Sequence, residues 1–455
     1  PAFGQSVEQI YAAEALRDRA LSDPTAFNLL ESLTTEIGAR QAGTPAGARA
    51  KDWGLAKLKA MGFSNVRAEP FPVTAWVRGA ERCEVISPFP QVLHILGLGN
   101  SAPTPPAGIE AETAVFKTYD ALLAAPVGSL AGKIAVCTQP MMRAQDGSGY
   151  GAMNPARRQG PSEAARRGAV AYLVRSLSTG SGPLPHTGAM AYVEGVPKIP
   201  CAALGVSDAE LLDRMVRFAG DRPIRIRLYM ESTSTPNAPA WNVSGEIEGS
   251  EKPDELVVIG GHLDSWDPGT GAIDDGAGVV ITTAAAKLIG DLARHPKRTI
   301  RVVMFGAEET DFSGRAYAAA HRDEISKMVL AAESDSGSDR VWSLRLPVGA
   351  AQLPGLKALP GILAPLKIAL GEPGRAGGSD VGPLIAQGVP SIGLRPDASR
   401  HFDWHHPAAD TSDKVDPAQL NQNVAAWAAC IYLIADGDFD LRTLAPPPPA
   451  AGPAR

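Results

Sequence analysis

The sequence has 455 residues, of which 44% are hydrophobic and 20% are charged. This composition is ordinary for a globular protein, and the length predicts two domains or one large domain with an insertion. The formal net charge of −6 argues against nucleic acid as a partner, because a nucleic-acid-binding protein would carry a basic face. No stretch approaches about 18 consecutive apolar residues, so the sequence predicts no membrane span.

The cysteines and the first residue of the chain give information on the cellular location of the protein. Cys83, Cys137, Cys201 and Cys430 lie far apart without CxxC spacing, which excludes a zinc ribbon and a dense disulfide framework. A pair between Cys137 and Cys201 stays open, although a structural thiol is the preferred interpretation of each. The chain starts with Pro rather than Met, which predicts that a signal peptide has been removed and that the protein is secreted or periplasmic.

The N-terminal region, from Val7 to about Gly62, has the periodicity of helices. The segment from Thr44 to Met61 predicts a helix with Thr as its cap and Pro in its first turn. After Gly62, residues 65–76 predict an extended segment, and the prolines within it favour the edge of a sheet.

Proline and glycine become frequent between Val77 and Pro236, which predicts a separate, smaller domain inserted into a larger one. Its predicted elements are strands at 132–138, 169–174 and 197–204 and helices at 162–167 and 208–218. The predicted domains are the N-terminal part of the catalytic domain (1–76), the inserted domain (77–236), the rest of the catalytic domain (237–440) and a disordered Pro/Ala tail (441–455).

Strands and helices alternate after residue 237. The predicted strands are 256–259, 299–305, 328–332 and 388–394, with helices after Gly278, from Ser313 and at 416–435. Asp416 is the expected cap of the last helix, with Pro417 in its first position. This alternation predicts an α/β fold with a mostly parallel sheet and helices on both of its faces.

Acidic residues and histidines follow the ends of these predicted strands. In a parallel sheet consecutive strand ends lie side by side, so we expect these side chains to converge on one crevice. They are His262, Asp264 and Asp274 after the first strand, Glu308 and Glu309 after the second, Asp335 after the third, and His405 and His406 further downstream.

Two imidazoles and three or more carboxylates are too many for one tetrahedral zinc. They suit two metal ions about 3.5–4 Å apart that share a carboxylate. With Asp274 as the bridge, His262 and Asp335 complete one site, and Glu309 and His406 complete the other.

Two acidic residues remain beside these ligands. Glu308 would stand next to a metal-bridging water, where a general base is required. Asp264, two residues after His262, is expected to accept the second N–H of that imidazole and so fix its tautomer.

Each motif alone also has an ordinary structural interpretation. An isolated H-x-D at a strand end binds a metal roughly one time in five, and an E-E pair is functional roughly one time in ten. The His405-His406 pair beside Trp404 could be an aromatic loop, and His186 is interpreted as a loop residue. The conjunction of four strand-end loops, each with a candidate ligand, favours the metal site.

The motifs HLDSWDPGTGAIDDGAG, GAEE, ESDSG, GGSD and HHPAADT resemble those of the co-catalytic dizinc aminopeptidase and glutamate carboxypeptidase family. The resemblance covers the chain from about Val7 to Asp436, and the inserted region is similar to a protease-associated domain. It implies the same five ligands, with His406 rather than His405 because the family ligand precedes an acid-Thr pair by four residues. It further implies a cis peptide between Asp274 and Asp275, and a homodimer.

The resemblance leaves the role of His405 open. Several relatives have a Tyr at this position that stabilises the tetrahedral intermediate, and His405 could donate the same hydrogen bond.

The sequence therefore predicts a dizinc exopeptidase that hydrolyses dipeptides or short peptides with a free terminus, by attack of a metal-bridging water with Glu308 as the base. One alternative is a catalytically inactive receptor or binding module on the same fold, which loss of metal ligands would favour. Another is a single-zinc enzyme of the glutaminyl cyclase type, which metal stoichiometry would distinguish.

Overall fold

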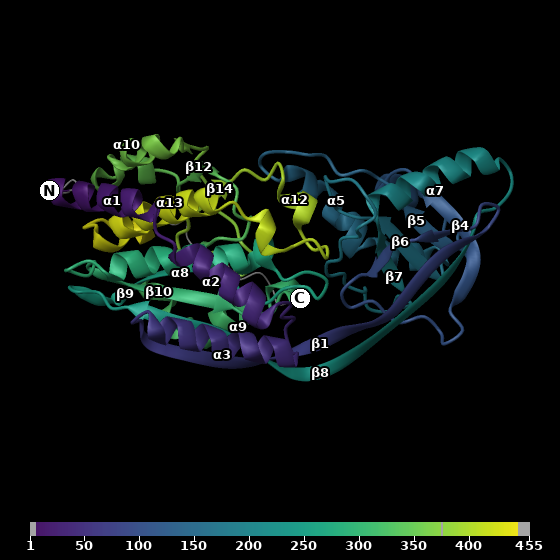
Figure 1. Cartoon of the computed structure of the whole chain (residues 1–455), viewed down its shortest axis with the longest axis horizontal. Coiled ribbons are helices and arrows are strands. Elements are labelled where there is room, and N and C mark those ends of the chain that lie inside the picture. The colour runs from purple at the N-terminus through teal and green to yellow at the C-terminus, as the bar shows by residue number, and fades with distance from the viewer. Residues whose placement is uncertain (1–5, 375, 445–455) are drawn as a thin grey trace. The chain divides into compact units, whose positions relative to one another are not determined.

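The computed structural model describes residues 6–374 and 376–444. The chain divides into two compact units, which are described separately. Unit 1 contains Pro1–Val73, Pro239–Asp397 and Thr411–Arg455, and unit 2 contains Thr74–Ala238 and Ala398–Asp410. The two long strands β1 (Ser64–Ser87) and β8 (Arg225–Ile247) each contribute to both units (Figure 1).

The sheet of unit 1 has the strand order β11–β9–β10–β8. Strand β9 (Lys252–His262) pairs in parallel with both β10 (Arg298–Phe305) and β11 (Met328–Glu333), while β10 pairs antiparallel with the C-terminal part of β8. All residues of β10 and β11 are buried, which explains their nearly continuous apolar sequence. The predicted α/β fold with a mostly parallel sheet is confirmed.

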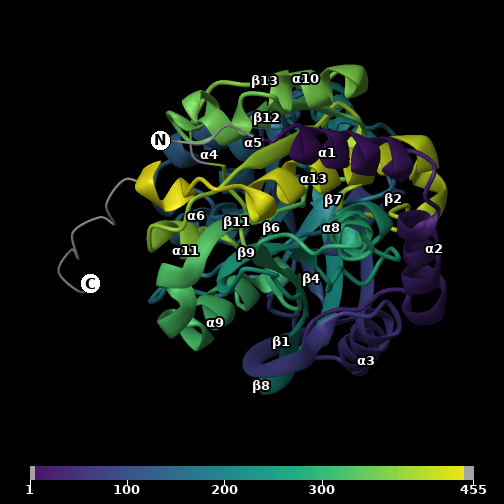
Figure 2. The ribbon, with the colours of Figure 1, turned by 90° about the vertical axis from the view of Figure 1, so that its left-hand side faces the viewer.

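Helices cover both faces of this sheet (Figure 2). On one face lie α8 (Ala277–Gly290) and α13 (Pro417–Asp436), with α1 (Val7–Ala20) and α2 (Thr25–Ser32) packed against them. On the other face, α9 (Ser313–Ala320) and α11 (Gly382–Ala386) share a hydrophobic core with β9, β10 and β11.

Two helices of unit 1 begin as the sequence predicts. Thr44 caps α3 (Pro45–Ala60) by accepting a hydrogen bond of 3.2 Å from the backbone N–H of Gly47. Asp416 caps α13 by accepting hydrogen bonds from the backbone N–H groups of Ala418 and Gln419, at 2.8 and 3.2 Å. A cap of this kind stabilises a helix by about 1 kcal/mol, and in both helices Pro occupies the first turn.

A second, three-stranded sheet lies outside the main sheet. The strand predicted at 388–394 forms later, as β14 (Gly393–Pro396), and pairs antiparallel with β12 (Val341–Arg345), which pairs in parallel with β13 (Ala369–Leu370). Helix α10 (Leu359–Leu363) lies between β12 and β13 in the chain. The start of the predicted strand is instead a turn after α11, in which Gly388 has a φ of +97°.

The end of the described chain is ordered. Residues Leu441–Leu444 form a 3₁₀ turn, and Leu441 is fully buried. The prediction of disorder from residue 441 is therefore wrong for these four residues, and the rest of the predicted tail lies outside the described residues.

Unit 2 is built on its own sheet, in the order β8–β4–β5–β6–β7–β3. Strands β4 to β7 are parallel, β8 and β3 are antiparallel to their neighbours, and β1 pairs antiparallel with the short β2. The strands are β2 (Gln91–Leu93), β3 (Ile95–Gly97), β4 (Ile109–Phe116), β5 (Ile134–Cys137), β6 (Ala171–Arg175) and β7 (Cys201–Leu204).

Helices also cover both faces of the sheet in unit 2. One core contains side chains of α4, α5 and α6, and the other contains side chains of α7. The helices are α4 (Tyr119–Ala124), α5 (Ser148–Arg158), α6 (Gly160–Arg166) and α7 (Val206–Ala219). Helix α5 is not among the elements that the sequence predicts.

The segment Ala398–Asp410 packs with unit 2, although it lies within the sequence of the predicted catalytic domain. It contains the short helix α12 (His401–Trp404). The backbone N–H of Ala398 donates to Gln145 O at 2.9 Å, the hydroxyl of Ser178 donates to Phe402 O at 2.9 Å, and the Phe402 ring joins the core around α5.

The cysteines are buried free thiols, so Cys137 and Cys201 do not form a disulfide. A search of the described residues found no helix with the length and hydropathy needed to span a membrane.

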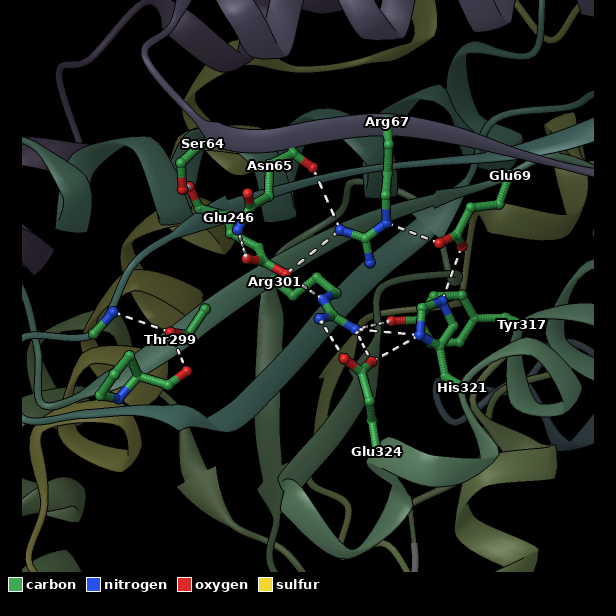
Figure 3. A network of polar contacts seen from close by, with 12 residues as sticks. Ser64, Asn65, Arg67, Glu69, Glu246, Thr299, Arg301, Tyr317, His321 and Glu324 are labelled. Carbon is green, nitrogen blue, oxygen red and sulfur yellow. Dashed lines mark hydrogen bonds and ion pairs between the residues drawn. The ribbon is translucent and has the colours of Figure 1, made fainter.

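A buried ionic network ties β1, β8 and β10 to the segment after α9 (Figure 3). At its centre, Arg301 on β10 donates to Glu246 at 2.6 Å and to Glu324 at 2.5 Å. The ring of His321 has Glu324 at 2.7 Å from Nδ1 and Glu69 at 2.9 Å from Nε2. Both ring nitrogens of His321 therefore lie within hydrogen-bonding distance of a carboxylate.

The pKa values of two glutamates in this network are low. Burial alone would raise the pKa of Glu69, but hydrogen bonds from His321 and Arg67 outweigh it and lower this pKa to about 2. The hydrogen bond from Arg301 lowers the pKa of Glu324 to about 2 against the effect of burial. Both groups therefore stabilise the folded state as anions.

We expect the substitution Arg301→Met to lower the free energy of unfolding by about 3–5 kcal/mol, because it leaves buried carboxylates without their counter-charge. Urea denaturation at pH 7 measures this change. The control is Arg19→Met, which removes an exposed partner of Asp291 and should change stability by less than about 1 kcal/mol. Equal effects of the two substitutions would contradict the assigned role of the network.

We expect the destabilisation caused by Glu324→Gln to depend on pH. A carboxylate whose pKa is lowered on folding stabilises the protein above its unfolded pKa, and this contribution disappears as the pH falls through its folded pKa. The gap in unfolding free energy between wild type and Glu324→Gln should thus be full above pH 4.5 and narrow from there towards pH 2. A gap that stays constant across this range in denaturant titrations would refute the assignment.

Candidate metal centre

The candidate site lies at the carboxyl ends of the three parallel strands of unit 1. His262 is the last residue of β9 and is paired in register with Phe305, the last residue of β10. The chain after β10 turns into the 3₁₀ turn η3 (Glu308–Thr310), and Asp335 follows two residues after the end of β11. The parallel register therefore brings side chains from three separate segments to one edge of the sheet.

Three carboxylates surround the Nε2 atom of His262. The distances from Nε2 are 3.1 Å to Asp274, 3.7 Å to Asp335 and 4.0 Å to Glu308. His262 and Asp274 are buried, whereas the side chains of Glu308 and Asp335 keep 14% and 25% of their surface exposed. The exposed side of the cluster is therefore the side of Glu308 and Asp335.

Asp264 lies against the other ring nitrogen of His262, as expected, but mainly through its backbone. The Nδ1 atom is 3.0 Å from the carbonyl oxygen of Asp264 and 3.5 Å from its carboxylate. The carboxylate instead accepts hydrogen bonds from the backbone N–H groups of Glu308, at 3.0 Å, and Glu309, at 3.4 Å. Asp264 therefore offers an acceptor to Nδ1 of His262 and also holds the backbone of the glutamate pair.

A π-helical turn, η2 (Ala272–Gly276), carries Asp274 and Asp275. The peptide bond between them is cis, as the family resemblance implied. The carboxylate of Asp275 accepts hydrogen bonds from the backbone N–H groups of His262, at 2.9 Å, and Gly278, at 3.0 Å. Asp275 thus links the end of β9 to the start of α8, and this leaves Asp274 to face the imidazole.

The burial of so many acidic groups raises several pKa values. Burial and the nearby carboxylates raise the pKa of Asp335 well above its usual range, against the effect of His262. Burial likewise raises the pKa of Glu308 and, well above its usual range, that of Asp275. Although burial lowers the pKa of His262, the acidic side chains around it outweigh this effect. The raised pKa values show that the cluster holds more carboxyl groups than its one imidazole can balance as anions.

The donor set fits a divalent cation. Within unit 1, two groups have ligand atoms within 4.8 Å of one another: His262 with Asp274 and Glu309, and His262 with Asp275 and Asp335. Imidazole nitrogen and carboxylate oxygen are zinc ligands, and a cation here would favour the carboxylate form of these groups. Two backbone N–H groups already occupy the Asp275 carboxylate, whereas Asp274 lies 3.1 Å from His262 Nε2.

His405 and His406 belong to unit 2, and their surroundings are described within that unit. Their rings stack with centroids 3.5 Å apart, and both residues are buried. The Nδ1 atom of His406 lies 3.1 Å from Thr187 O, and that of His186 lies 2.6 Å from His405 O. His186, interpreted from sequence as a loop residue, is therefore buried and positions His405, and burial lowers its pKa to about 4.

Three residues near the centre had no predicted role. Glu333 at the end of β11 accepts hydrogen bonds at 3.0 Å from the backbone N–H groups of Asp380 and Val381, and burial raises its pKa to about 7. Asp380 accepts a hydrogen bond of 2.5 Å from the hydroxyl of Ser313. Ser379 is hydrogen-bonded to Glu308. The GGSD motif, which contains Ser379 and Asp380, is the sequence feature that could have predicted a role for these two residues.

Pocket geometry agrees with an accessible centre. A pocket within unit 1 is lined by Asp335 and Glu333 together with the glycines and serine of the GGSD motif, Gly377, Gly378 and Ser379, and by Ser336. This pocket reaches the exposed side of the carboxylate cluster.

Comparison with known sequences supports one family. The model of peptidase family M28 matches residues 242–431. Carboxypeptidase Q from Bos taurus is 38% identical over 412 residues, which cover 90% of this chain and 85% of that protein. Carboxypeptidase Q from Homo sapiens is 36% identical over 415 residues, with 90% and 85% covered.

Comparison with solved structures agrees. The crystal structure of a peptidase M28 precursor from Shewanella amazonensis has a TM-score of 0.93 and 42% identity, and the match covers 97% of this chain and 99% of that one. An aminopeptidase from Aneurinibacillus has a TM-score of 0.65 at 20% identity, covers 93% and 96% of the two chains, and thus shares the fold. The chain therefore belongs to peptidase family M28 and is a zinc-dependent peptidase similar to carboxypeptidase Q.

Proposed function

We propose that this chain is a dizinc exopeptidase that hydrolyses dipeptides or short peptides with a free terminus. The observation that carries the proposal is the cluster around His262. One buried imidazole faces three carboxylates from three strand ends, which is more anionic ligand capacity than one tetrahedral zinc uses. The surplus supports two metals that share a carboxylate, with one further carboxylate as a base.

We assign the metal ligands by position in the chain. Asp274 is the proposed bridge, His262 and Asp335 complete one site, and Glu309 belongs to the second. His406 is proposed as the remaining ligand of the second site from its place before Asp410 and Thr411 in the family motif. Its Nδ1–H is directed at Thr187 O, and this assigns metal bonding to Nε2.

When bound, the two zinc ions would polarise the scissile carbonyl and lower the pKa of the attacking water. Glu308 accepts the proton of that water and returns it to the leaving amine. Burial raises the pKa of Glu308, which favours uptake of a proton by this carboxylate. Asp264 keeps Glu308 in place through the backbone N–H, and His405 is the proposed donor to the developing oxyanion.

The relatives support an exopeptidase on peptide substrates. Carboxypeptidase Q from several vertebrates matches most of this chain, and probable leucine aminopeptidase 2 from Aspergillus fumigatus is 30% identical over 159 residues, 34% of this chain and 29% of that protein. A protease-associated role for the inserted unit, a homodimer, and secretion or a periplasmic location are parts of the same proposal.

The competing functions make different predictions for metal content. An inactive binding module would lack ligands, whereas all five proposed ligands are present in this sequence. A glutaminyl cyclase-like enzyme would bind one zinc per chain, whereas the proposal requires two. Measurement of zinc per chain therefore discriminates among the three functions.

Arg40 contacts the loop that joins β9 to η2. This loop connects the proposed ligands His262 and Asp274. It is fully buried, and its guanidinium donates to the backbone carbonyls of Leu263, of Thr270 at 2.6 Å and of Gly271 at 2.8 Å. One side chain from the N-terminal region thus clamps both ends of the loop that separates His262 from Asp274. We infer that Arg40 is a positioning residue for the metal ligands.

We expect Glu308→Gln to retain about two zinc ions per chain and to lose about 10²–10⁴-fold in kcat, because it removes the base and leaves the ligands. Elemental analysis and dipeptide hydrolysis measure the two quantities. The control is Glu84→Gln, a change of an exposed glutamate in unit 2. A Glu308→Gln enzyme with bound metal and near-normal turnover would exclude Glu308 as the base.

We expect Arg40→Met to lower zinc affinity by about 10–100-fold, the usual loss when a residue that orients metal ligands is removed. Competition with a zinc chelator measures the affinity. The control is Arg49→Met, which changes an exposed arginine on α3. If Arg40→Met keeps the wild-type affinity for zinc, the loop does not depend on this clamp for metal binding.

A further inference from the structure

One face of α13 carries three amide side chains that hydrogen-bond to a single backbone segment. They are Gln419, Gln422 and Asn423, and their spacing of three and four residues places them on the same side of the helix. The segment that they bind is residues 338–341, which joins the loop after β11 to the start of β12. Helix α13 contacts both β12 and β14 (Figure 1), and all of these elements belong to unit 1.

Two of the amides bind the irregular part of this segment. The Nδ2 atom of Asn423 donates to Ser338 O at 3.3 Å and to Asp339 O at 2.9 Å. The Oε1 atom of Gln419 accepts a hydrogen bond of 3.0 Å from the backbone N–H of Arg340. The three bound residues lie outside the strands, where no sheet ladder supplies partners. Because Ser338 is buried, an unpaired carbonyl there would cost free energy.

Gln422 holds the first residue of β12. Its Oε1 atom accepts a hydrogen bond from the backbone N–H of Val341, and its Nε2 atom donates to Val341 O, both at 2.9 Å. Gln422 is 1% exposed and Asn423 is 0% exposed. Breaking their bonds would leave amide donors and backbone carbonyls buried without partners, which costs free energy. Both amides therefore stay in the geometry that holds the segment 338–341.

The segment 338–341 ends the loop that carries Asp335. The other end of this loop is fixed by β11 and by a hydrogen bond of 2.9 Å from the backbone N–H of Ser334 to Gly260 O on β9. Only Asp335 and the two residues that follow it lie between the two fixed ends. A connection this short restricts the backbone of Asp335 once both of its ends are held.

The carboxylate of Asp335 depends on this backbone for its position. It lies 3.7 Å from His262 Nε2, and no hydrogen bond to it forms within residues 6–374 and 376–444. The carboxylate of Asp275, by contrast, is held by two backbone N–H groups. A shift of the loop backbone would therefore move Asp335 away from the cluster without any side-chain contact to oppose it.

We propose that Gln422 and Asn423 are positioning residues for the proposed metal ligand Asp335. They hold the backbone of residues 338–341 and thereby fix the loop from which Asp335 reaches the cluster around His262. The inference rests on the proposed function for the role of Asp335. It adds a dependence of zinc binding on a helix that supplies no ligand itself.

The test measures zinc affinity rather than turnover. Competition with a chelator gives the zinc dissociation constants of wild type, of Asn423→Leu, of Asp335→Asn and of the variant with both changes. Asn423→Leu keeps the size of the side chain and removes both bonds to the segment, so it should weaken the binding of one zinc ion about 10–100-fold. In the Asp335→Asn background the same change should have no further effect, within about twofold, because the residue through which it acts is already removed.

Two further variants on the same helix complete the design. Asn421→Leu removes an amide that donates to Leu21 O at 3.4 Å, away from the segment, and should keep the wild-type zinc affinity within about twofold. Gln419→Met changes a half-buried residue and removes only the bond to Arg340. It should weaken zinc binding about 2–10-fold, and it keeps the test decisive should Asn423→Leu fail to fold.

The outcomes separate this inference from the proposed function. If wild type binds zinc and the loss in Asn423→Leu depends on Asp335, but no dipeptide is hydrolysed, the exopeptidase assignment fails and the positioning role stands. If Asn423→Leu keeps the wild-type affinity, matches Asn421→Leu, or causes the same loss with and without Asp335, the positioning role is refuted even where hydrolysis is observed. A wild type that binds no zinc refutes both.

Discussion

The parallel pairing of β9 with β10 and β11 is the constraint on which the site depends. In the pairing register, His262 lies directly beside Phe305. Because the three strands run parallel, the turns that follow them leave the sheet at the same edge. A slip of one residue in β9 would turn His262 to the opposite face of the sheet. The complete burial of β10 and β11 fixes this register, because every alternative would move apolar side chains out of a core. The chemistry of the site therefore rests on ordinary strand packing.

Unit 1 contains two clusters of buried acidic groups, and they differ in the number of cationic partners. In the network around Arg301, hydrogen bonds from arginines and from His321 hold the pKa values of Glu69 and Glu324 low. The cluster around His262 has carboxylates in excess, and the pKa values of Asp335 and Glu308 are raised. The first arrangement is complete within the polypeptide and stabilises the fold. The cluster around His262 favours a bound cation. The balance between carboxylates and cationic groups therefore distinguishes the structural network from the candidate metal centre in the same unit.

Sequence patterns predicted the features that depend on neighbouring residues. The strand-end positions of His262, Glu308 and Asp335, the caps at Thr44 and Asp416, and the α/β fold all follow from local periodicity. Contacts between residues far apart in the sequence were not predicted. Arg40 bonds to a loop that lies more than 200 residues later in the chain. The segment Ala398–Asp410 packs with unit 2 through contacts with residues far upstream. Helix α5 was missed because Gly and Pro interrupt it.

The grouping of Ala398–Asp410 with unit 2 has a consequence for the modularity of this chain. Residues 77–236 are predicted from sequence alone to be an insertion, which suggests that they are removable. However, His406 contacts Thr187 through its ring and its backbone carbonyl, Ala398 donates to Gln145 O, and both Thr187 and Gln145 belong to that insertion. A shortened chain that joins β1 directly to the C-terminal half of β8 would retain the sheet and the His262 cluster but would lose the scaffold of the HHPAADT motif. The insertion and the segment Ala398–Asp410 therefore have to be inherited, exchanged or engineered together.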